Sequence, residues 1–94
     1  MLPVYADVHG CAEDPSMYFA DHHSIKCIDM KSFNNTFVNV KTVKTGLAKV
    51  GAIDIDHRER MIYWSDQVQY TLSRMSLVTG ETDVSSYKTF TESL

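Results

Sequence analysis

The sequence lacks a long hydrophobic run and an excess of positive charge. No window approaches the roughly 18 consecutive apolar residues that cross a bilayer, so we expect no membrane insertion by this chain. The net charge is −3 and the nine Lys and Arg residues are scattered, so nucleic acid is not an expected partner. The N-terminus has neither the basic nor the apolar region of a signal peptide. We expect no signal peptide in this chain and, if the protein is secreted, a longer parent protein.

Motifs for catalysis and for metal binding are also missing. The sequence contains no Gly-x-Ser-x-Gly elbow, no P-loop and no dinucleotide fingerprint, so we expect neither enzymatic activity nor a cofactor. His22, His23 and His57 match no zinc spacing and are interpreted as solvated loop histidines. Asp54 and Asp56 resemble part of a calcium loop, but its Gly and distal Glu are absent. No metal site is therefore expected.

Helical periodicity is absent, and short β-rich runs take its place. No segment keeps a 3.6-residue apolar period for three turns, and turn signals recur about every 8 to 12 residues, which is typical of all-β folds. An immunoglobulin sandwich would have its Trp between two cysteines, whereas Trp64 follows both Cys11 and Cys27. The expected strands are residues 17–20, 25–30, 36–40, 50–56, 61–65, 71–77 and 82–88, with a connector over 41–49.

Two aromatic runs form an internal repeat. Tyr18-Phe19-Ala20-Asp21 recurs about 45 residues later as Tyr63-Trp64-Ser65-Asp66. The alignment continues with Ile25 on Leu72 if the second loop is two residues longer. This period, with four short strands per unit, is the scale of a propeller blade. Successive strand residues point to opposite faces, so the two aromatics of each run are expected to pack on different neighbouring blades.

The second repeat resembles a known family. Ala52-Ile53-Asp54-Ile55-Asp56, then Ile62-Tyr63-Trp64-Ser65-Asp66, then Leu72-Ser73-Arg74 with Leu77 are similar to the YWTD repeat, the LDL-receptor class B repeat. Ser65 stands where the family has Thr, and Leu72 where it has Ile. The first repeat, residues 17–30, looks like the opening of such a propeller in LDL-receptor-related proteins. The resemblance covers residues 11–90.

The resemblance implies an all-β fold that is part of a six-bladed propeller. This chain would hold about two four-stranded antiparallel blades, with the rest of the propeller in a longer chain. Residues 1–16 would be an irregular lead-in that ends an EGF-like module, residues 17–41 a first blade without its inner strand, and residues 50–88 a second blade within the propeller part 17–94. The implied structural motif residues, with Asp66 tying strands or blades together, are Tyr18, Phe19, Asp21, Asp54, Tyr63, Trp64, Ser65, Asp66 and Arg74.

Two cysteines and one sequon are features whose interpretation depends on whether the protein is extracellular. Two cysteines permit a Cys11–Cys27 disulfide, but free thiols and a partner outside this chain remain open. By the resemblance, Cys11 lies where the preceding EGF-like module has its last cysteine. Asn34-Asn35-Thr36 is an N-glycosylation sequon, so Asn34 is expected to carry a glycan in a secreted domain.

The resemblance implies a binding function. The expected role is a non-catalytic, protein-binding module of a lipoprotein-receptor-like cell-surface receptor, which docks protein ligands in endocytosis or signalling. The expected location is the extracellular side of the plasma membrane, or outside the cell. The implied docking loops are residues 21–24, 42–49 and 66–70, with His22, Gln69 and Tyr70 as candidate contacts. The alternatives are a structural matrix or adhesion propeller of nidogen type and an independent small β domain.

Overall fold

The computed structural model describes residues 8–11, 16–29 and 40–86, which form seven strands. The strands make two antiparallel sheets, one of three strands and one of four. The all-β class is therefore confirmed. No helix in the described ranges is long and apolar enough to cross a bilayer. The strands are β1 (Ser16–Ala20), β2 (Ile25–Asp29), β3 (Val40–Lys44), β4 (Val50–Asp56), β5 (Met61–Asp66), β6 (Thr71–Ser76) and β7 (Thr82–Ser86).

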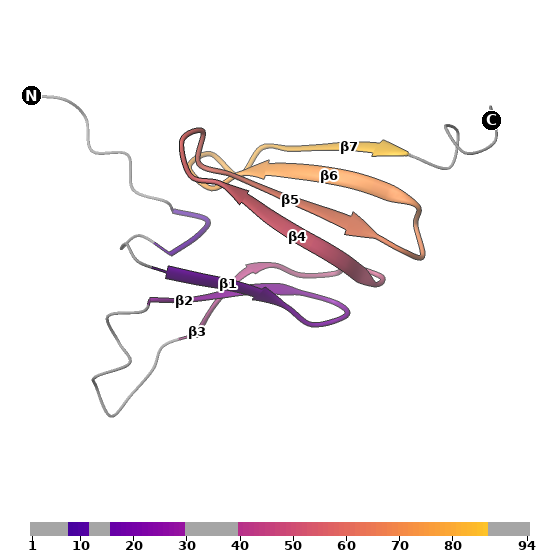
Figure 1. The fold of residues 1–94 in the computed structure, drawn as a ribbon, viewed down its shortest axis with the longest axis horizontal. Coiled ribbons are helices and arrows are strands. Elements are labelled where there is room, and N and C mark those ends of the chain that lie inside the picture. The colour runs from indigo at the N-terminus through magenta and orange to yellow at the C-terminus, as the bar shows by residue number, and fades with distance from the viewer. Residues whose placement is uncertain (1–7, 12–15, 30–39, 87–94) are drawn as a thin grey trace, which may run out of the picture.

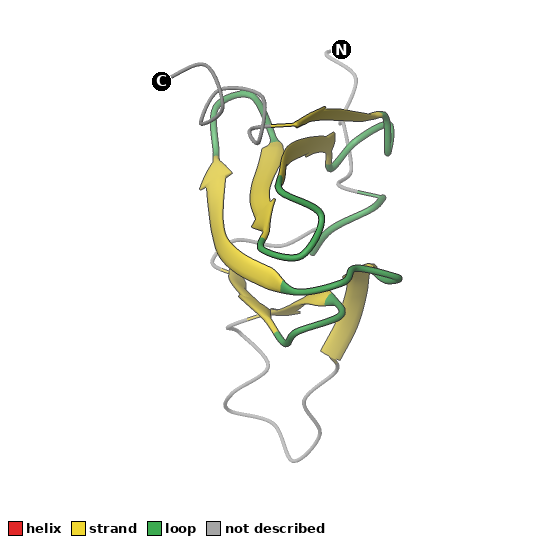
Figure 2. Ribbon diagram, turned by 90° about the vertical axis from the view of Figure 1, so that its right-hand side faces the viewer, coloured by secondary structure: helices red, strands yellow, loops and turns green. Residues whose placement is uncertain are grey.

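Each sheet is a meander in which strands pair in the order of the chain. The three-stranded sheet runs β1-β2-β3 and the four-stranded sheet β4-β5-β6-β7. Figures 1 and 2 show the two sheets as separate layers, with β4 of one sheet beside β1 of the other. The described strands close neither a barrel nor a ring, so the structure itself establishes two open sheets.

The third strand differs from the sequence prediction. We expected a strand over residues 36–40 and a connector from residue 41, but β3 occupies Val40–Lys44. Residues 36–39 lie outside the described part of the chain. The predicted connector is wrong over residues 41–44, because this segment pairs with β2. β3 is an edge strand of its sheet, a position that tolerates lysine side chains.

The hydrophobic core lies between the two sheets. On β5, Ile62 is fully buried and Trp64 is 4% exposed, and both belong to the cluster that includes Ile25 of β2. Tyr63 lies between them in sequence and points to the opposite face of the sheet, where it is 38% exposed. The two aromatics of the motif therefore point to opposite faces, as predicted, and Trp64 packs between the sheets.

The short N-terminal segment 8–11 connects the two sheets. A Cys11–Cys27 disulfide attaches it to β2, which resolves the open cysteine alternatives in favour of a bridge within this chain. The N–H of His9 donates to the carbonyl oxygen of Leu77 at 2.9 Å, just beyond β6. The ammonium group of Lys41 donates to the carbonyl oxygens of residues 8 and 10, each at 2.7 Å. The segment is therefore held by both sheets.

Candidate ligand-binding face

Two of the predicted docking loops, residues 21–24 and 66–70, lie beside the C-terminal part of the third at one end of the sheets. Residues 42–44 of that third segment, predicted as 42–49, belong to β3 instead. The N–H of Leu47 donates to the carbonyl oxygen of His23 at 3.0 Å, and the N–H of Val50 to that of His22 at 2.9 Å. The N–H of Gln67 donates to the carbonyl oxygen of Lys49 at 2.8 Å. The connector thus joins both hairpin loops. We call residues 21–24, 47–50 and 66–70 the loop face.

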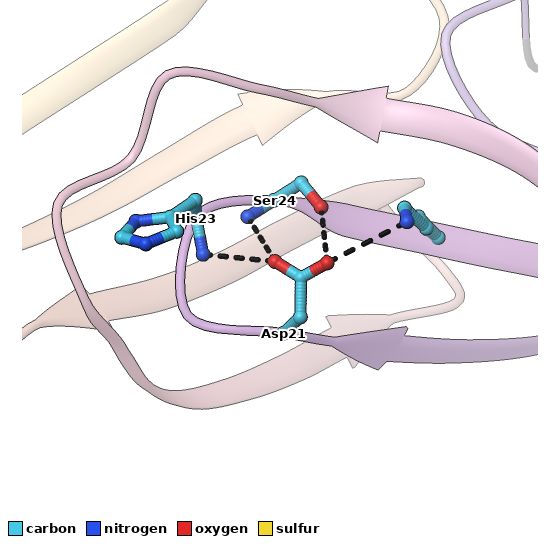
Figure 3. A network of polar contacts seen from close by, with 4 residues as sticks. Asp21, His23 and Ser24 are labelled. Carbon is cyan, nitrogen blue, oxygen red and sulfur yellow. Dashed lines mark hydrogen bonds and ion pairs between the residues drawn. The ribbon is translucent and has the colours of Figure 1, made fainter.

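Asp21 organises the first loop, as Figure 3 shows. Its Oδ1 accepts from the backbone N–H groups of His23 and Ser24, each at 2.8 Å, and its Oδ2 accepts from the Ser24 hydroxyl at 2.9 Å. The Lys26 ammonium lies 3.5 Å from Oδ2. These contacts, the His23 N–H first and the Ser24 hydroxyl second, lower the pKa of Asp21 from 3.8 to about 2. The loop therefore depends on an ionised carboxylate.

Asp66 has the same position in the second loop and a further contact with the connector. Its Oδ1 accepts from the N–H groups of Val68 and Gln69, each at 3.0 Å, and its Oδ2 accepts from Ala48 at 3.0 Å. Asp66 is only 3% exposed. Burial by itself would raise its pKa, but the N–H donors of Gln69, Ala48, Val68 and Lys49 together lower the pKa below 3.8. The buried charge is held by backbone donors.

The three candidate contact residues are exposed on the loop face. His22 and Gln69 lie at the surface, and the Tyr70 side chain is 46% exposed. Tyr70 has a φ of 55°, a left-handed conformation that non-glycine residues seldom adopt. Val68, which no motif in the sequence indicated, precedes Gln69 and is 57% exposed. Backbone geometry thus presents an aromatic, an amide and an aliphatic side chain together.

The histidines of the loop face contact the protein in different ways. The His22 and His23 rings are edge to face, with centroids 6.1 Å apart. His23 Nδ1 lies 3.1 Å from the carbonyl oxygen of Leu47. Both side chains are exposed, as expected of loop histidines. Within the described ranges, no three His, Cys, Asp or Glu side chains are grouped to hold a metal ion.

The remaining motif residues lie on the strands. The Ser65 hydroxyl accepts from the N–H of Ala52 at 3.1 Å, and Arg74 pairs with Asp83 at 3.0 Å. Asp54 Oδ1 accepts from the next backbone N–H, at 2.9 Å. The hydroxyl of Tyr18 accepts from the N–H of residue 11 at 3.1 Å, and Phe19 is half-buried on β1. Asn34 lies outside the described residues, as do residues 1–7, 12–15, 87–94 and the rest of 30–39.

No family model matches this chain. The findings therefore establish an all-β chain of two antiparallel sheets with one disulfide and a face formed by three hydrogen-bonded loops.

Proposed function

We propose that this chain is an extracellular, non-catalytic protein-binding module that docks a protein ligand on the loop face. The proposal includes the YWTD interpretation: the two sheets are neighbouring blades of a β-propeller in a lipoprotein-receptor-like protein, and further repeats of a longer chain complete it. The observation that carries it is that the connector between the sheets is hydrogen-bonded to both hairpin loops, so that the three segments form one surface.

The loop face suits protein binding because hydrogen bonds hold its backbone and several of its side chains are exposed at the surface. The carboxylates of Asp21 and Asp66 accept hydrogen bonds from backbone N–H groups of their own loops. These bonds within the protein fix the loop geometry without a ligand. Tyr70 offers a large amphipathic surface of the kind enriched at protein interfaces. His22 and Gln69 supply hydrogen-bonding groups beside it. Pre-ordered loops lower the entropy cost of binding.

An extracellular location is supported by the disulfide. Disulfides persist in secreted and cell-surface proteins and are rare in reducing compartments. The Cys11–Cys27 bridge is consistent with an oxidising, extracellular environment. A ligand of this module would accordingly be a secreted or cell-surface protein.

The test compares two triple variants of the oxidised chain. The chain is immobilised and exposed to secreted proteins from conditioned cell medium, and retained proteins are identified by mass spectrometry. The loop-face variant carries His22→Ala, Gln69→Ala and Tyr70→Ala. The matched control changes three exposed residues of the β4–β5 loop at the opposite end of the sheet, which are His57, Arg58 and Glu59, to Ala.

We expect a protein that the original chain and the control retain and that the loop-face variant loses. Retention that survives the loop-face variant, or the absence of any retained protein, contradicts docking on this face. An extracellular-matrix protein as the retained species would select the matrix or adhesion alternative over the receptor.

A further inference from the structure

The registers of the two sheets establish which residues are structurally equivalent. Ala20 pairs with Ile25 in one hairpin and Ser65 with Leu72 in the other, so the two-residue loop difference expected from the sequence is correct. Tyr18 faces Cys27 as Tyr63 faces Arg74. Likewise Phe19 pairs with Lys26, as Trp64 pairs with Ser73, and Met17 with Ile28, as Ile62 with Met75.

Each sheet has an inner face, which packs on the other sheet, and an outer face, which points away from it. The equivalences relate the outer face of each sheet to the inner face of the other. The outer face of the three-stranded sheet, which carries Met17, Phe19, Lys26 and Ile28, is equivalent to the inner face of the four-stranded sheet. The outer face of the four-stranded sheet is equivalent to the inner face of the three-stranded sheet, and it carries Tyr63, Ser65, Leu72 and Arg74. The two outer faces are therefore copies of the two halves of the interface between the sheets.

Burial differs sharply between equivalent positions. Ile25 is fully buried between the sheets, whereas its equivalent Leu72 is 53% exposed. Ile62 is fully buried, whereas its equivalent Met17 is 42% exposed. Val40 of β3 pairs with Ile28, which pairs with Met17, so the three side chains lie on the same face. Val40 is 51% exposed. The apolar side chains that hold the sheets together have exposed counterparts on both outer faces.

We propose that this chain associates head to tail with a second copy of itself. The outer face of the three-stranded sheet in one copy packs on the outer face of the four-stranded sheet in the next. The contact repeats the one between the sheets within each copy, so Phe19 takes the place of Trp64 and lies against Tyr63 and Leu72. A hollow of about 240 Å³ beside these two residues receives the incoming ring.

Charge also favours this pairing over contact between identical faces. The outer face of the three-stranded sheet carries the cation Lys26 among apolar residues. The outer face of the four-stranded sheet carries two carboxylates, Asp54 and Asp83, against one guanidinium, Arg74, which pairs with Asp83. Lys26, whose ammonium also lies 3.5 Å from Asp21 of its own chain, thereby meets a face with one carboxylate more than it has guanidinium groups. Two identical four-stranded faces would instead bring carboxylates together.

The inference goes beyond the proposed function and concerns the 94-residue chain by itself. In a longer chain that completes a propeller, further repeats would cover the same two outer faces through the same contact. The outer-face residues lie on strands, and none belongs to the loop face. The loop-face variant should lose ligand capture but still associate with itself. Variants that no longer associate should still capture ligand as single copies. A head-to-tail contact uses two different surfaces, so it builds closed rings or open chains rather than stopping at a dimer.

The test uses one blocking variant for each face. Met17→Glu places a charge on the outer face of the three-stranded sheet, and Leu72→Glu places one on that of the four-stranded sheet. Both side chains are exposed in the single copy, so circular dichroism should show unchanged strands. Val84→Glu is the matched control, because Val84 is a 60% exposed strand residue on the opposite side of the four-stranded sheet from Leu72. Mass is followed by sedimentation over a range of concentrations.

We expect the original chain and the control to form oligomers larger than dimers. Each blocking variant alone should be a monomer, with its association constant lowered at least about tenfold, because the charge must be buried in an apolar contact. An equimolar mixture of the two variants should form a one-to-one dimer and nothing larger, since each still offers one intact face.

Three results would overturn the proposal. The first is a monomeric original chain at every concentration. The second is a dimer formed by either blocking variant alone, which would show contact between identical faces. The third is association that neither substitution weakens. If Met17→Glu or Leu72→Glu does not fold, Val40→Glu and Tyr63→Glu test the same two faces.

Discussion

Asp66 stabilises the loop face because its two carboxylate oxygens accept hydrogen bonds from different segments. Oδ1 closes its own loop through Val68 and Gln69, whereas Oδ2 accepts from Ala48 in the connector. Asp66→Asn keeps one acceptor oxygen and replaces the other by an amino group that faces N–H donors. We expect a loss of about 1–3 kcal/mol in the free energy of unfolding, because a buried donor is left without an acceptor. Urea unfolding at low protein concentration measures it.

Asp56→Asn is the matched control for that substitution. Asp56 also accepts from two loop N–H groups, those of Arg58 and Glu59, but both donate to Oδ1. Asn retains this acceptor, so the free energy of unfolding should change by less than about 0.5 kcal/mol. Equal losses for the two substitutions would show that the contact of Asp66 with the connector contributes nothing.

Asp21 gives the chain a pH dependence with a defined sign. Its folded pKa is lowered to about 2, chiefly by the His23 N–H and the Ser24 hydroxyl, from an ordinary value of 3.8. A lowered carboxyl pKa stabilises the folded state above pH 3.8, and this stabilisation is lost as the pH falls toward 2. The stability difference between the original chain and Asp21→Asn should therefore shrink across that interval. A difference that stays constant would mean that the Asp21 carboxylate is not held as described.

At the scale of elements, one kind of loop recurs in four hairpins. A polar side chain at the end of the first strand accepts from the N–H groups two and three residues later, and the four acceptors are Asp21, Asp56, Asp66 and Ser76. In the last three hairpins, the residue four positions after the acceptor has a positive φ, and these residues are Arg60, Tyr70 and Gly80. The side chain thus supplies the turn and a left-handed residue returns the chain to the next strand.

Arg60 is a site where this loop geometry is strained. Its φ is 54°, and a left-handed conformation costs a non-glycine residue about 1–2 kcal/mol. Arg60→Gly removes that strain but adds about 0.5–1 kcal/mol of backbone entropy cost, so the protein should be stabilised slightly, by about 0.5 kcal/mol. Arg58→Gly in the same loop, which has no positive φ to relieve, should destabilise it. Thermal unfolding of the two variants should give shifts of opposite sign, and shifts of the same sign would contradict the strain.

The strands could be predicted where a period of two was clean, and the loops only in part. Ile53 and Ile55 alternate with Asp54 and Asp56, and β4 lies where this pattern placed it. β3 was misplaced, because residues 41–44 of the predicted connector pair with β2. The left-handed φ of Arg60 follows from the length of the loop and the register of the strands. The identity of residue 60 does not predict it. The joining of three loops by the connector depends on pairing between distant segments and was inferred only through the resemblance.

At the scale of the whole molecule, segment 8–11 holds the two sheets in place. It is tied to the three-stranded sheet by the Cys11–Cys27 bridge and to the four-stranded sheet by the hydrogen bond from His9 to Leu77. Leu77 is itself fully buried in the core between the sheets. The bridge therefore stabilises the packing of both sheets as well as the fold of one.

Reduction of the bridge should accordingly loosen the sheet interface. A disulfide that closes a loop of this length, with its cysteines 16 residues apart, stabilises a protein by about 2–4 kcal/mol. We expect reduction to lower the free energy of unfolding by this amount and to red-shift the fluorescence of Trp64, which is packed between the sheets. It should also increase hydrogen exchange at the N–H of His9. A control with the same reductant on a Cys11→Ser, Cys27→Ala double variant should show no further change. Unchanged His9 exchange with lowered stability would confine the role of the bridge to the three-stranded sheet.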